Sequence, residues 1–410
     1  MTSPLEAAVT DLSGVPSSPW GARPSLDRLL QAIRKHMGMD VAFISEFKDG
    51  RRFFRQVEIG ESALAIKPGD SDPLQESYCQ RVVDGRLPEL IRDACVNIEA
   101  LKLPATRAVP VGAHLSVPIR LANGHVYGTF CCFSHAPDPT LTERDLKVMR
   151  VFSDMAADQI QLDLDRQQFR HQVEDRIEAV LRTGGLRMVY QPIVDVATGR
   201  VAGFESLARF ESDPYRTPDL WFAEAAQVGR LVELESQAIR LALSGLAGLP
   251  ESVYVTVNAS PETIVKGAVA DVLRGQPLQR LVVEVTEHQA IECYEDIADA
   301  IEPLQRDGLR IAIDDAGAGY ASFRHVLNLH PHIVKLDNSI THAIDVDRSR
   351  RALAAALCGF AAETGCGIVA EGVETQAELE AVRALGIGKA QGYHLGRPMS
   401  FVDARASLLH

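Results

Sequence analysis

The sequence has no excess of positive charge and no long apolar stretch. Its 55 acidic residues outnumber 42 basic residues, which gives a formal net charge of −13. Nonspecific binding to duplex nucleic acid depends mostly on Lys and Arg neutralising phosphates, so that function class is excluded. No run of about 18 apolar residues occurs, and the first residues lack the basic stretch and apolar core of a secretion signal. We therefore expect a cytoplasmic protein that binds neither nucleic acid nor a membrane.

Cysteine is scarce and irregularly spaced. The seven cysteines show no CxxC pair, and an odd number without a secretion signal argues against a disulfide framework. We expect them to be reduced and mostly in the core. Cys79, within SYCQRVVDG, has two interpretations: a sensory or ligand-contacting thiol, or a small buried apolar residue. We favour the second, because a free cysteine usually behaves as a small hydrophobic side chain.

Lysine is rare in the second half, and several catalytic motifs are missing throughout. After residue 150 the sequence holds only three lysines, Lys266, Lys335 and Lys389, so a lysine at the end of a strand invites a specific role. A P-loop, an HExxH zinc motif and a Gly-rich dinucleotide fingerprint are all absent. These absences argue against the corresponding enzyme classes.

The second half instead contains eight short apolar or β-branched segments, most of them separated by stretches of helical period. Strands that alternate with helices predict a parallel sheet, and eight such units in about 230 residues predict a TIM-type (β/α)8 barrel over residues 180–410. The segments are VYQPI, AGFESLA, VYVTVNA, LVVEVTE, RIAIDDA, IVKLD, GIVAEGV and KAQGYHL.

Polar side chains stand where these apolar runs end. In a barrel of this kind the chemistry is carried at the carboxyl ends of the strands. One acid there is more often a helix cap or a loop anchor, but seven polar residues at consistent places favour a common site. Carboxylate and amide oxygens suit Mg²⁺ or Mn²⁺ rather than zinc. The seven residues are Glu205, Asn258, Glu284, Asp314, Asp315, Lys335 and Glu371.

The first part of the chain predicts a smaller α+β domain. Residues 1–21 show no periodicity and are expected to be a disordered tail. Residues 22–165 then predict a helix capped by Ser25, a central sheet, a helix over residues 71–83 and a hairpin turning at Asn123-Gly124. The segments SYCQRVVDGRLPELI, GAHLSVPIRL and VYGTFCCFS resemble the GAF sensory family. That resemblance implies sensing of an unidentified ligand or signal. The alternative is a platform for dimerisation alone.

A long helix is expected to connect the two domains. Residues 141–181 contain no Pro or Gly, and Thr140 and Glu143 have the spacing of a capping box. An apolar stripe formed by Phe169, Val173, Ile177 and Val180 predicts a two-stranded seam between subunits. A homodimer joined by a stiff rod is one interpretation. The other is a pair of helices, broken near residues 159–165, that fold back on their own domains.

Glu205 lies in FESLARF, which resembles the Glu-Ala-Leu signature of EAL-domain cyclic di-GMP phosphodiesterases. Further motifs follow in the order of that family over about residues 180–405: YQPIVD, VNAS, EVTE, DDAGAGYAS, VKLD, AEGVE and QGY. The resemblance implies hydrolysis of cyclic di-GMP to linear pGpG with two Mg²⁺ or Mn²⁺ ions. No segment resembles GGDEF, so synthesis of that messenger is not expected.

The resemblance also implies a role for each motif residue. A first ion would be held by Glu205, Asn258, Glu284 and Asp314, and Asp315 would help to hold a second. Lys335 and Glu371 would be catalytic, Glu371 as the general base. Gln191, Arg209 and Gln391 would contact substrate or water. Glu287 would anchor the loop after Asp315, and Asp337 stays open between supporting the site and contacting water.

Three positions depart from the family pattern. Ala316 stands where a Phe is common after the paired aspartates, Ser206 replaces the Ala of the signature, and His332 replaces an Asp. None of these changes removes a ligand, so activity is expected, although the Ala316 loop could weaken it. The alternative functions are a weak or inactive cyclic di-GMP receptor that signals to a partner, and a scaffold that binds neither metal nor nucleotide.

Overall fold

The structure is a computed structural model in which the chain forms two compact units, residues 1–168 and 169–410. For residues 315, 316 and 320–323 the backbone alone is described. The predicted tail, residues 1–21, lies outside the described part of the chain. The described residues are 25–60, 66–211, 215–286, 293–316 and 320–409.

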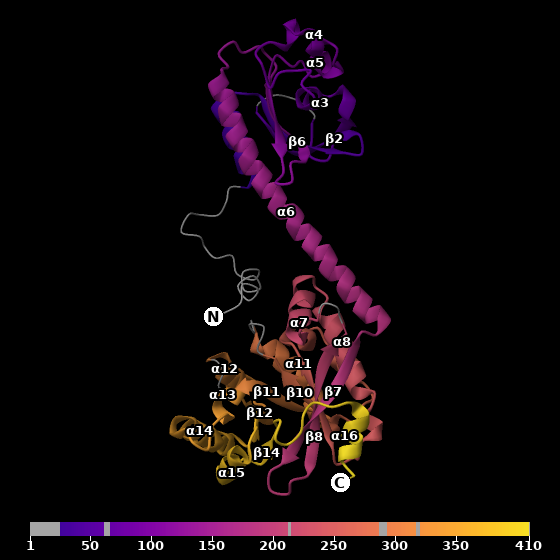
Figure 1. Ribbon diagram of the computed structural model, residues 1–410, viewed down its shortest axis with the longest axis vertical. Coiled ribbons are helices and arrows are strands. Elements are labelled where there is room, and N and C mark those ends of the chain that lie inside the picture. The colour runs from indigo at the N-terminus through magenta and orange to yellow at the C-terminus, as the bar shows by residue number, and fades with distance from the viewer. Residues whose placement is uncertain (1–24, 61–65, 212–214, 287–292, 317–319, 410) are drawn as a thin grey trace. The chain divides into compact units, whose positions relative to one another are not determined.

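The first unit is built on a six-stranded antiparallel sheet with the order β3-β2-β1-β6-β5-β4. Its two faces carry separate apolar cores. One face packs against α2 and α6, and the other against α3, α4 and α5 (Figure 1). The elements before α6 are α2 (Leu26–Met37), β1 (Val41–Lys48), β2 (Arg51–Ile59), β3 (Ser71–Pro73), η1 (Leu74–Glu76), α3 (Tyr78–Val83), β4 (Leu90–Ile91), η2 (Ala94–Val96), α4 (Ile98–Leu101), α5 (Pro104–Ala108), β5 (Ala113–Arg120) and β6 (Val126–Ser134).

Local sequence explains most of these boundaries. The hairpin between β5 and β6 turns at Asn123-Gly124, as predicted, with Gly124 at a φ of 80°. The helix predicted over residues 71–83 is wrong in its first half. Residues 71–73 pair with β2 as strand β3, and the helix begins only at Tyr78 because Ser77 caps it by accepting the Gln80 N–H.

Helix α6 (Glu143–Thr183) is a single helix of 41 residues. Its start differs from the predicted Thr140 cap, because the Asp145 carboxylate accepts the N–H of Thr142 and the Thr142 hydroxyl accepts the N–H of Arg144. Val173, Ile177 and Val180 do not form the predicted seam between subunits. They are buried within the second unit, in a core that includes Phe210 and Trp221.

The second unit is a closed barrel of eight strands, which confirms the TIM-type fold class (Figure 1). The order around the barrel is β10-β11-β12-β13-β14-β7-β8-β9. The strands are β7 (Leu186–Asp195), β8 (Val201–Phe210), β9 (Tyr254–Ala259), β10 (Leu281–Val285), β11 (Arg310–Ala316), β12 (Ile333–Leu336), β13 (Gly367–Ala370) and β14 (Lys389–Ala390).

One strand departs from the all-parallel arrangement predicted from the sequence. β7 runs antiparallel to both of its neighbours, β8 and β14. The reason is the short β7–β8 connection, residues 196–200, because a parallel crossover needs a dozen or more residues. The turn is closed by the Asp195 carboxylate, which accepts the backbone N–H and the hydroxyl of Thr198. β7 and β8 are therefore a hairpin within the barrel wall.

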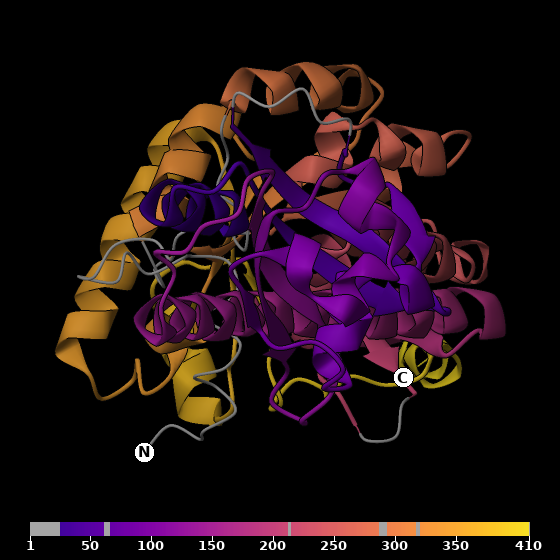
Figure 2. The ribbon, with the colours of Figure 1, turned by 90° about the horizontal axis from the view of Figure 1, so that it is seen from above.

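Helices cover the outside of the barrel, and Figure 2 shows those of residues 294–364 at the edge of the unit. Among the described residues, no helix is both long enough and apolar enough to cross a bilayer. The elements between the strands and at the end are α7 (Pro218–Gln227), α8 (Leu231–Leu243), η3 (Leu246–Gly248), α9 (Pro261–Val265), α10 (Ala268–Leu273), η4 (Leu278–Arg280), α11 (Tyr294–Arg306), α12 (Tyr320–Leu329), α13 (Asn338–Thr341), α14 (Arg348–Thr364), α15 (Gln376–Ala384) and α16 (Phe401–Ser407).

Candidate active site

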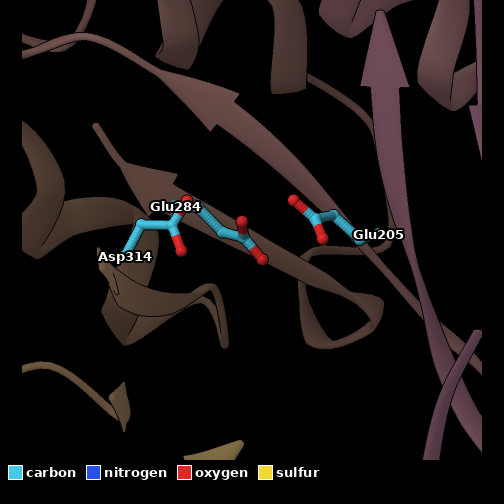
Figure 3. A group of neighbouring side chains, drawn as sticks. All are labelled: Glu205, Glu284 and Asp314. Carbon is cyan, nitrogen blue, oxygen red and sulfur yellow. The ribbon is translucent and has the colours of Figure 1, made fainter. Parts of the chain in front are cut away.

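Three carboxylates from three strands meet inside the barrel. Glu205 lies on β8, Glu284 on β10 and Asp314 on β11, and each offers an oxygen within 4.8 Å of the other two. Figure 3 shows the Glu205 side chain pointing toward the other two carboxylates. Glu205 is the fifth of the ten residues of β8, yet it forms the last pair of β8 with β9, opposite Thr256. It therefore still lies where the parallel ladder ends.

Lys335 lies at the centre of this acidic group. Its Nζ atom is 2.8 Å from a carboxylate oxygen of Glu284, 3.0 Å from Asp314, 2.7 Å from Glu371 and 3.3 Å from Glu205. The lysine side chain is only 2% exposed. One ammonium thus faces four carboxylates, and the group keeps an excess of negative charge when all five side chains are ionised.

This imbalance shifts the acid–base properties of the group. Burial would lower the pKa of Lys335, but the surrounding carboxylates raise it well above its ordinary value. Burial raises the pKa of Glu284 to about 8, with a further contribution from Glu205 and Asp314 that Lys335 partly offsets. Burial and the same two carboxylates raise the pKa of Glu371 well above its usual range. The site has more acidic groups than one lysine can neutralise.

Two glutamines connect the acidic group to the antiparallel strand. The Gln391 amide, just after β14, donates to Glu205 Oε2 at 2.5 Å and to Gln191 Oε1 at 3.1 Å. Gln191 faces Glu205 directly across the β7–β8 hairpin and donates to the Gly396 carbonyl at 3.2 Å. Both predicted glutamines therefore lie at the site, although Gln191 is in mid-strand. The buried Oε1 of Gln391 has no partner among the described atoms.

Neighbouring structure fixes the strands that carry these side chains. Asn258 pairs with Glu284 in the parallel ladder of β9 and β10. Ser260 follows β9 directly, and the buried Glu235 carboxylate of α8 accepts both its backbone N–H and its hydroxyl. Glu371 follows β13, and its N–H donates to the Leu336 carbonyl at 3.0 Å.

One cavity adjoins the acidic group, and a second cavity shares Arg209 with it. The larger, about 500 Å³, has Glu205, Asn258 and Asp314 among its lining residues, with apolar side chains of α7 and α8 such as Phe222. The smaller, about 370 Å³, is lined by Arg209 with Arg187, Tyr393 and Arg397. The Arg397 guanidinium lies 4.3 Å from the centre of the Tyr393 ring. Arg209 and apolar walls thus lie next to the carboxylates, and the second cavity adds two more cations and a planar ring beyond Arg209.

The sequence analysis did not identify Arg187, Tyr393 and Arg397. Arg187 and Arg209 are directly opposite each other on β7 and β8, and like charges so placed destabilise a sheet unless something compensates them. The facing of the two arginines can be recognised only once the β7–β8 hairpin and its register are known. Glu211 supplies part of the compensation, since its carboxylate oxygen lies 3.3 Å from Arg187 Nε.

Three further predicted residues are Asp315, Glu287 and Asp337. Asp315 follows Asp314 in β11, and its backbone position alone is described. Glu287 lies outside the described residues, as does most of the loop after Ala316. The Asp337 carboxylate accepts the Ser339 N–H at 2.9 Å and so caps α13.

Two of the family departures have a local explanation. The Ser206 hydroxyl is buried and donates to the Thr256 carbonyl at 2.5 Å, so the extra oxygen relative to alanine is satisfied. His332 Nδ1 accepts the Ile311 N–H at 3.2 Å, which joins the start of β12 to β11.

Comparison with known protein families gives two matches. Residues 173–398 match the EAL domain and residues 23–160 match the GAF domain. The chain is similar to a probable cyclic di-GMP phosphodiesterase of Escherichia coli strain K12, PdeG. The two are 28% identical over 242 residues, which are 56% of this chain and 48% of that protein. The chain spans less than half the length of the first curated relatives that it matches.

Solved structures give the same picture. The PaMucR phosphodiesterase in complex with cyclic di-GMP is 28% identical, with a TM-score of 0.51, and the match covers 57% of this chain and 99% of that one. An EAL enzyme bound to cAMP and cyclic di-GMP matches 90% of this chain and 93% of its own, with a TM-score of 0.57. Its identity is only 16%, so that likeness shows the fold alone.

Proposed function

Because the chain belongs to the EAL domain family, we propose that it is a phosphodiesterase that hydrolyses cyclic di-GMP to linear pGpG with Mg²⁺ or Mn²⁺. The observation that carries this proposal is the group of four carboxylates around Lys335, beside a cavity that Arg209 also lines. The similarity to a probable cyclic di-GMP phosphodiesterase and to a phosphodiesterase in complex with cyclic di-GMP supports the choice of substrate.

The donor set fits divalent cations. Carboxylate oxygens from Glu205, Glu284 and Asp314 converge, Asn258 lines the same cavity, and hard oxygen donors are those that Mg²⁺ and Mn²⁺ prefer. The excess negative charge around Lys335 gives a cation a further electrostatic reason to bind. Two ions, the second held with the help of Asp315, would supply the charge that polarises a phosphodiester and activates water.

The protein's own residues would divide the remaining work. Arg209 would bind a phosphate oxygen, since a guanidinium pairs well with phosphate. Lys335 would hold the carboxylates in place and offset negative charge as it develops. Glu371, whose oxygen lies 2.7 Å from Lys335 Nζ, would accept the proton of the attacking water. Gln191 and Gln391 would orient substrate or water, and Asp337 would act indirectly by holding α13.

Regulation and assembly belong to the same proposal. The GAF-like unit would sense a signal and transmit it through α6, which continues without interruption from one unit to the other. The protein would act as a homodimer in the cytoplasm. Since Val173, Ile177 and Val180 are buried, the contact between two copies would use other residues of α6.

Chromatographic turnover of cyclic di-GMP by the full-length protein tests the function. We expect pGpG to form with Mn²⁺ or Mg²⁺ and to be absent with EDTA. A Glu205→Gln variant should lose about 100-fold or more of the turnover, the scale of removing one group that stabilises the reaction's charge. Nucleotide binding without any product would favour the receptor alternative. Binding of neither metal nor nucleotide would favour the scaffold.

A further inference from the structure

A cluster with two thiols lies inside the first unit, whereas the site already described belongs to the second. Cys79 of α3 and Cys131 of β6 have their Sγ atoms 3.6 Å apart, and both side chains are fully buried. Arg52 of β2, itself buried, donates from Nη1 to Cys79 Sγ at 3.2 Å. Asp72 and the Phe54 ring, whose centre lies 4.5 Å from the guanidinium carbon, hold this buried cation beside one sulfur of a close thiol pair.

The charges within the cluster distinguish the two sulfurs. Burial alone would raise the pKa of Cys79, but the hydrogen bond with Cys131 and the charge of Arg52 lower that pKa to about 5. Burial and the neighbouring Cys79 raise the pKa of Cys131 well above its usual range. The pair therefore holds one thiolate and one thiol at neutral pH. Asp72 holds the guanidinium, with its Oδ1 atom 2.9 Å from Arg52 Nε.

The groups around the sulfurs suit this division. Ser116 and Thr129 each place a hydroxyl 3.1 Å from Cys131 Sγ. His114, whose pKa burial and the charge of Arg52 lower to about 3, remains neutral. The Tyr78 ring packs 4.7 Å from that of His114, and burial raises the pKa of its hydroxyl, which lies 2.6 Å from the Thr106 hydroxyl.

A metal is a poorer explanation of the cluster. Soft ions bind several Cys or His ligands that converge on one point. Among the described residues, the metal-ligating side chains that converge on one point are Glu205, Glu284 and Asp314 of the barrel. That group contains no cysteine. Two sulfurs in contact beside a guanidinium resemble a reactive dithiol instead, because the thiolate is the nucleophilic form of cysteine.

We propose that Cys79 and Cys131 form a reversible disulfide when the protein meets a hydroperoxide. The Cys79 thiolate attacks the peroxide, the O–O bond breaks, and the departing oxygen takes a proton and leaves as water or an alcohol. Cys79 is then a sulfenic acid. The Cys131 sulfur displaces its hydroxyl, the S–S bond forms, and the hydroxyl leaves as water with the Cys131 proton. The two thiols lose two electrons, which reduce the peroxide, and a dithiol reductant restores them.

The fold gives this bond a route to the long helix. A disulfide would tie α3 to β6, on the face of the sheet opposite α6. The next residue of β6, Cys132, points to the other face, where its Sγ lies 3.8 Å from Met149 Sδ of α6. A bond that shifts β6 therefore acts on a strand that contacts α6 directly. This inference does not depend on the function proposed for the barrel.

Peptide mass spectrometry on the intact protein tests the bond. Reduced full-length protein is exposed to hydrogen peroxide, its remaining thiols are alkylated, and its peptides are analysed without reductant. We expect a peptide pair linked through Cys79 and Cys131 that separates after dithiothreitol. Cys132→Ser, the neighbouring cysteine on the opposite face, should retain the link, and Cys79→Ser should lose it. The exposed Cys95 serves as the reference for peroxide exposure. If Cys95 is fully oxidised while Cys79 is still a thiol that the alkylating reagent modifies, the proposal is overturned.

The pH dependence of the peroxide reaction tests the guanidinium. The rate constant for loss of the Cys79 thiol should be nearly constant between about pH 8 and pH 6 in the wild type, because the thiolate persists there. In Arg52→Gln the pKa of the Cys79 thiol should be raised, and below that pKa the rate constant should fall about tenfold for each unit of pH. Arg52→Lys keeps the charge and should largely restore the flat profile. Identical profiles in all three folded proteins would show that Arg52 does not activate Cys79.

Discussion

At the scale of single residues, Lys335 decides how the acidic group is held together. Four carboxylates surround it, and its side chain is 2% exposed. Removing one partner of a buried ion pair leaves the other charges unpaired, which costs about 3–5 kcal/mol. Lys335→Ala should therefore lower the free energy of unfolding strongly in EDTA. Mn²⁺ should restore more stability to this variant than it adds to the wild type.

Thermal and denaturant unfolding of both proteins, with and without Mn²⁺, checks this expectation. Turnover of cyclic di-GMP should fall about 100-fold or more in Lys335→Ala even when metal is present. Lys266→Ala is the matched control, because Lys266 is exposed and pairs only with Glu262, four residues earlier in the chain, among the ion pairs of the described residues. Equal stability of the two variants in EDTA would mean that the ammonium does not hold the carboxylates.

The sequence predicted the members of this site better than their contacts. Glu205, Glu284 and Lys335 could be picked out because charged residues rarely stand inside apolar strands without a reason. Their meeting around one ammonium depends on which strands are neighbours and how they are registered, and a single sequence does not contain that information. Arg187 was missed for the same reason, because its importance follows from the residue it faces.

At the scale of elements, the close approach of the segments that follow β13 and β14 positions Gln391. A Cβ at Gly392 would lie 2.1 Å from the Val373 carbonyl oxygen and 2.3 Å from its backbone nitrogen. Backbone atoms cannot move aside as a flexible side chain can. Gly392→Ala should push the segment after β14 away from the segment after β13 and disturb the bond from Gln391 to Glu205.

We expect Gly392→Ala to lose about 1–3 kcal/mol of stability, the usual effect of overpacking, together with most of the turnover. Chemical denaturation and the chromatographic assay measure the two effects. Gly388→Ala serves as the control, because a Cβ there meets nothing within 4 Å. If the two alanine variants behave alike, the close approach has no role in positioning Gln391.

Helix α15 provides a pH-dependent contribution to stability. The Glu378 carboxylate accepts the backbone N–H groups of Ala343, Glu374 and Thr375 at 2.8, 2.8 and 3.0 Å. Burial opposes ionisation, but these bonds lower the pKa of Glu378 below its ordinary value. Since the folded-state pKa lies below the unfolded one, the stabilisation is present above about pH 4.3 and is lost as the pH falls through the folded pKa.

Glu378→Gln should therefore cost about 1–3 kcal/mol at neutral pH and progressively less in acid. Denaturant unfolding at a series of pH values measures the difference between the wild type and the variant. Glu380→Gln, an exposed position on the same helix, should show almost no difference at any pH. A cost for Glu378→Gln that stays constant into acid would mean that the charged form of Glu378 is not what stabilises the cap.

The predicted elements were confirmed where a local pattern determines them and were wrong where chain direction depends on a connection. Eight apolar segments gave eight barrel strands, but β7 was expected to be parallel. Its side-chain pattern is the same in either direction, because alternation along a strand has no polarity. The five-residue connection from Val196 to Arg200 contained the decisive information, since it is too short for a crossover.

At the scale of the whole molecule, the proposed homodimer has a candidate contact surface on the exposed side of α6. Met155, Leu162 and Phe169 follow one another at intervals of seven residues, so they lie along one side of the helix. Their exposed fractions are 41%, 38% and 38%, high for large apolar side chains in a regular helix. The Leu162→Asp, Phe169→Asp double variant should therefore abolish dimerisation without unfolding either unit.

Sedimentation equilibrium over a range of concentrations measures the outcome. The wild type should have twice the mass of the 44.7 kDa chain, and the double variant should have the mass of one chain. Gln167→Asp, Gln168→Asp adds the same charge on the other side of the helix, where both residues are exposed, and should remain dimeric. A wild type that stays monomeric, or a double variant that dimerises as well as this control, would contradict assembly through α6. Because one buried apolar side chain contributes about 1.5–3 kcal/mol, two per subunit are enough to decide between the two states.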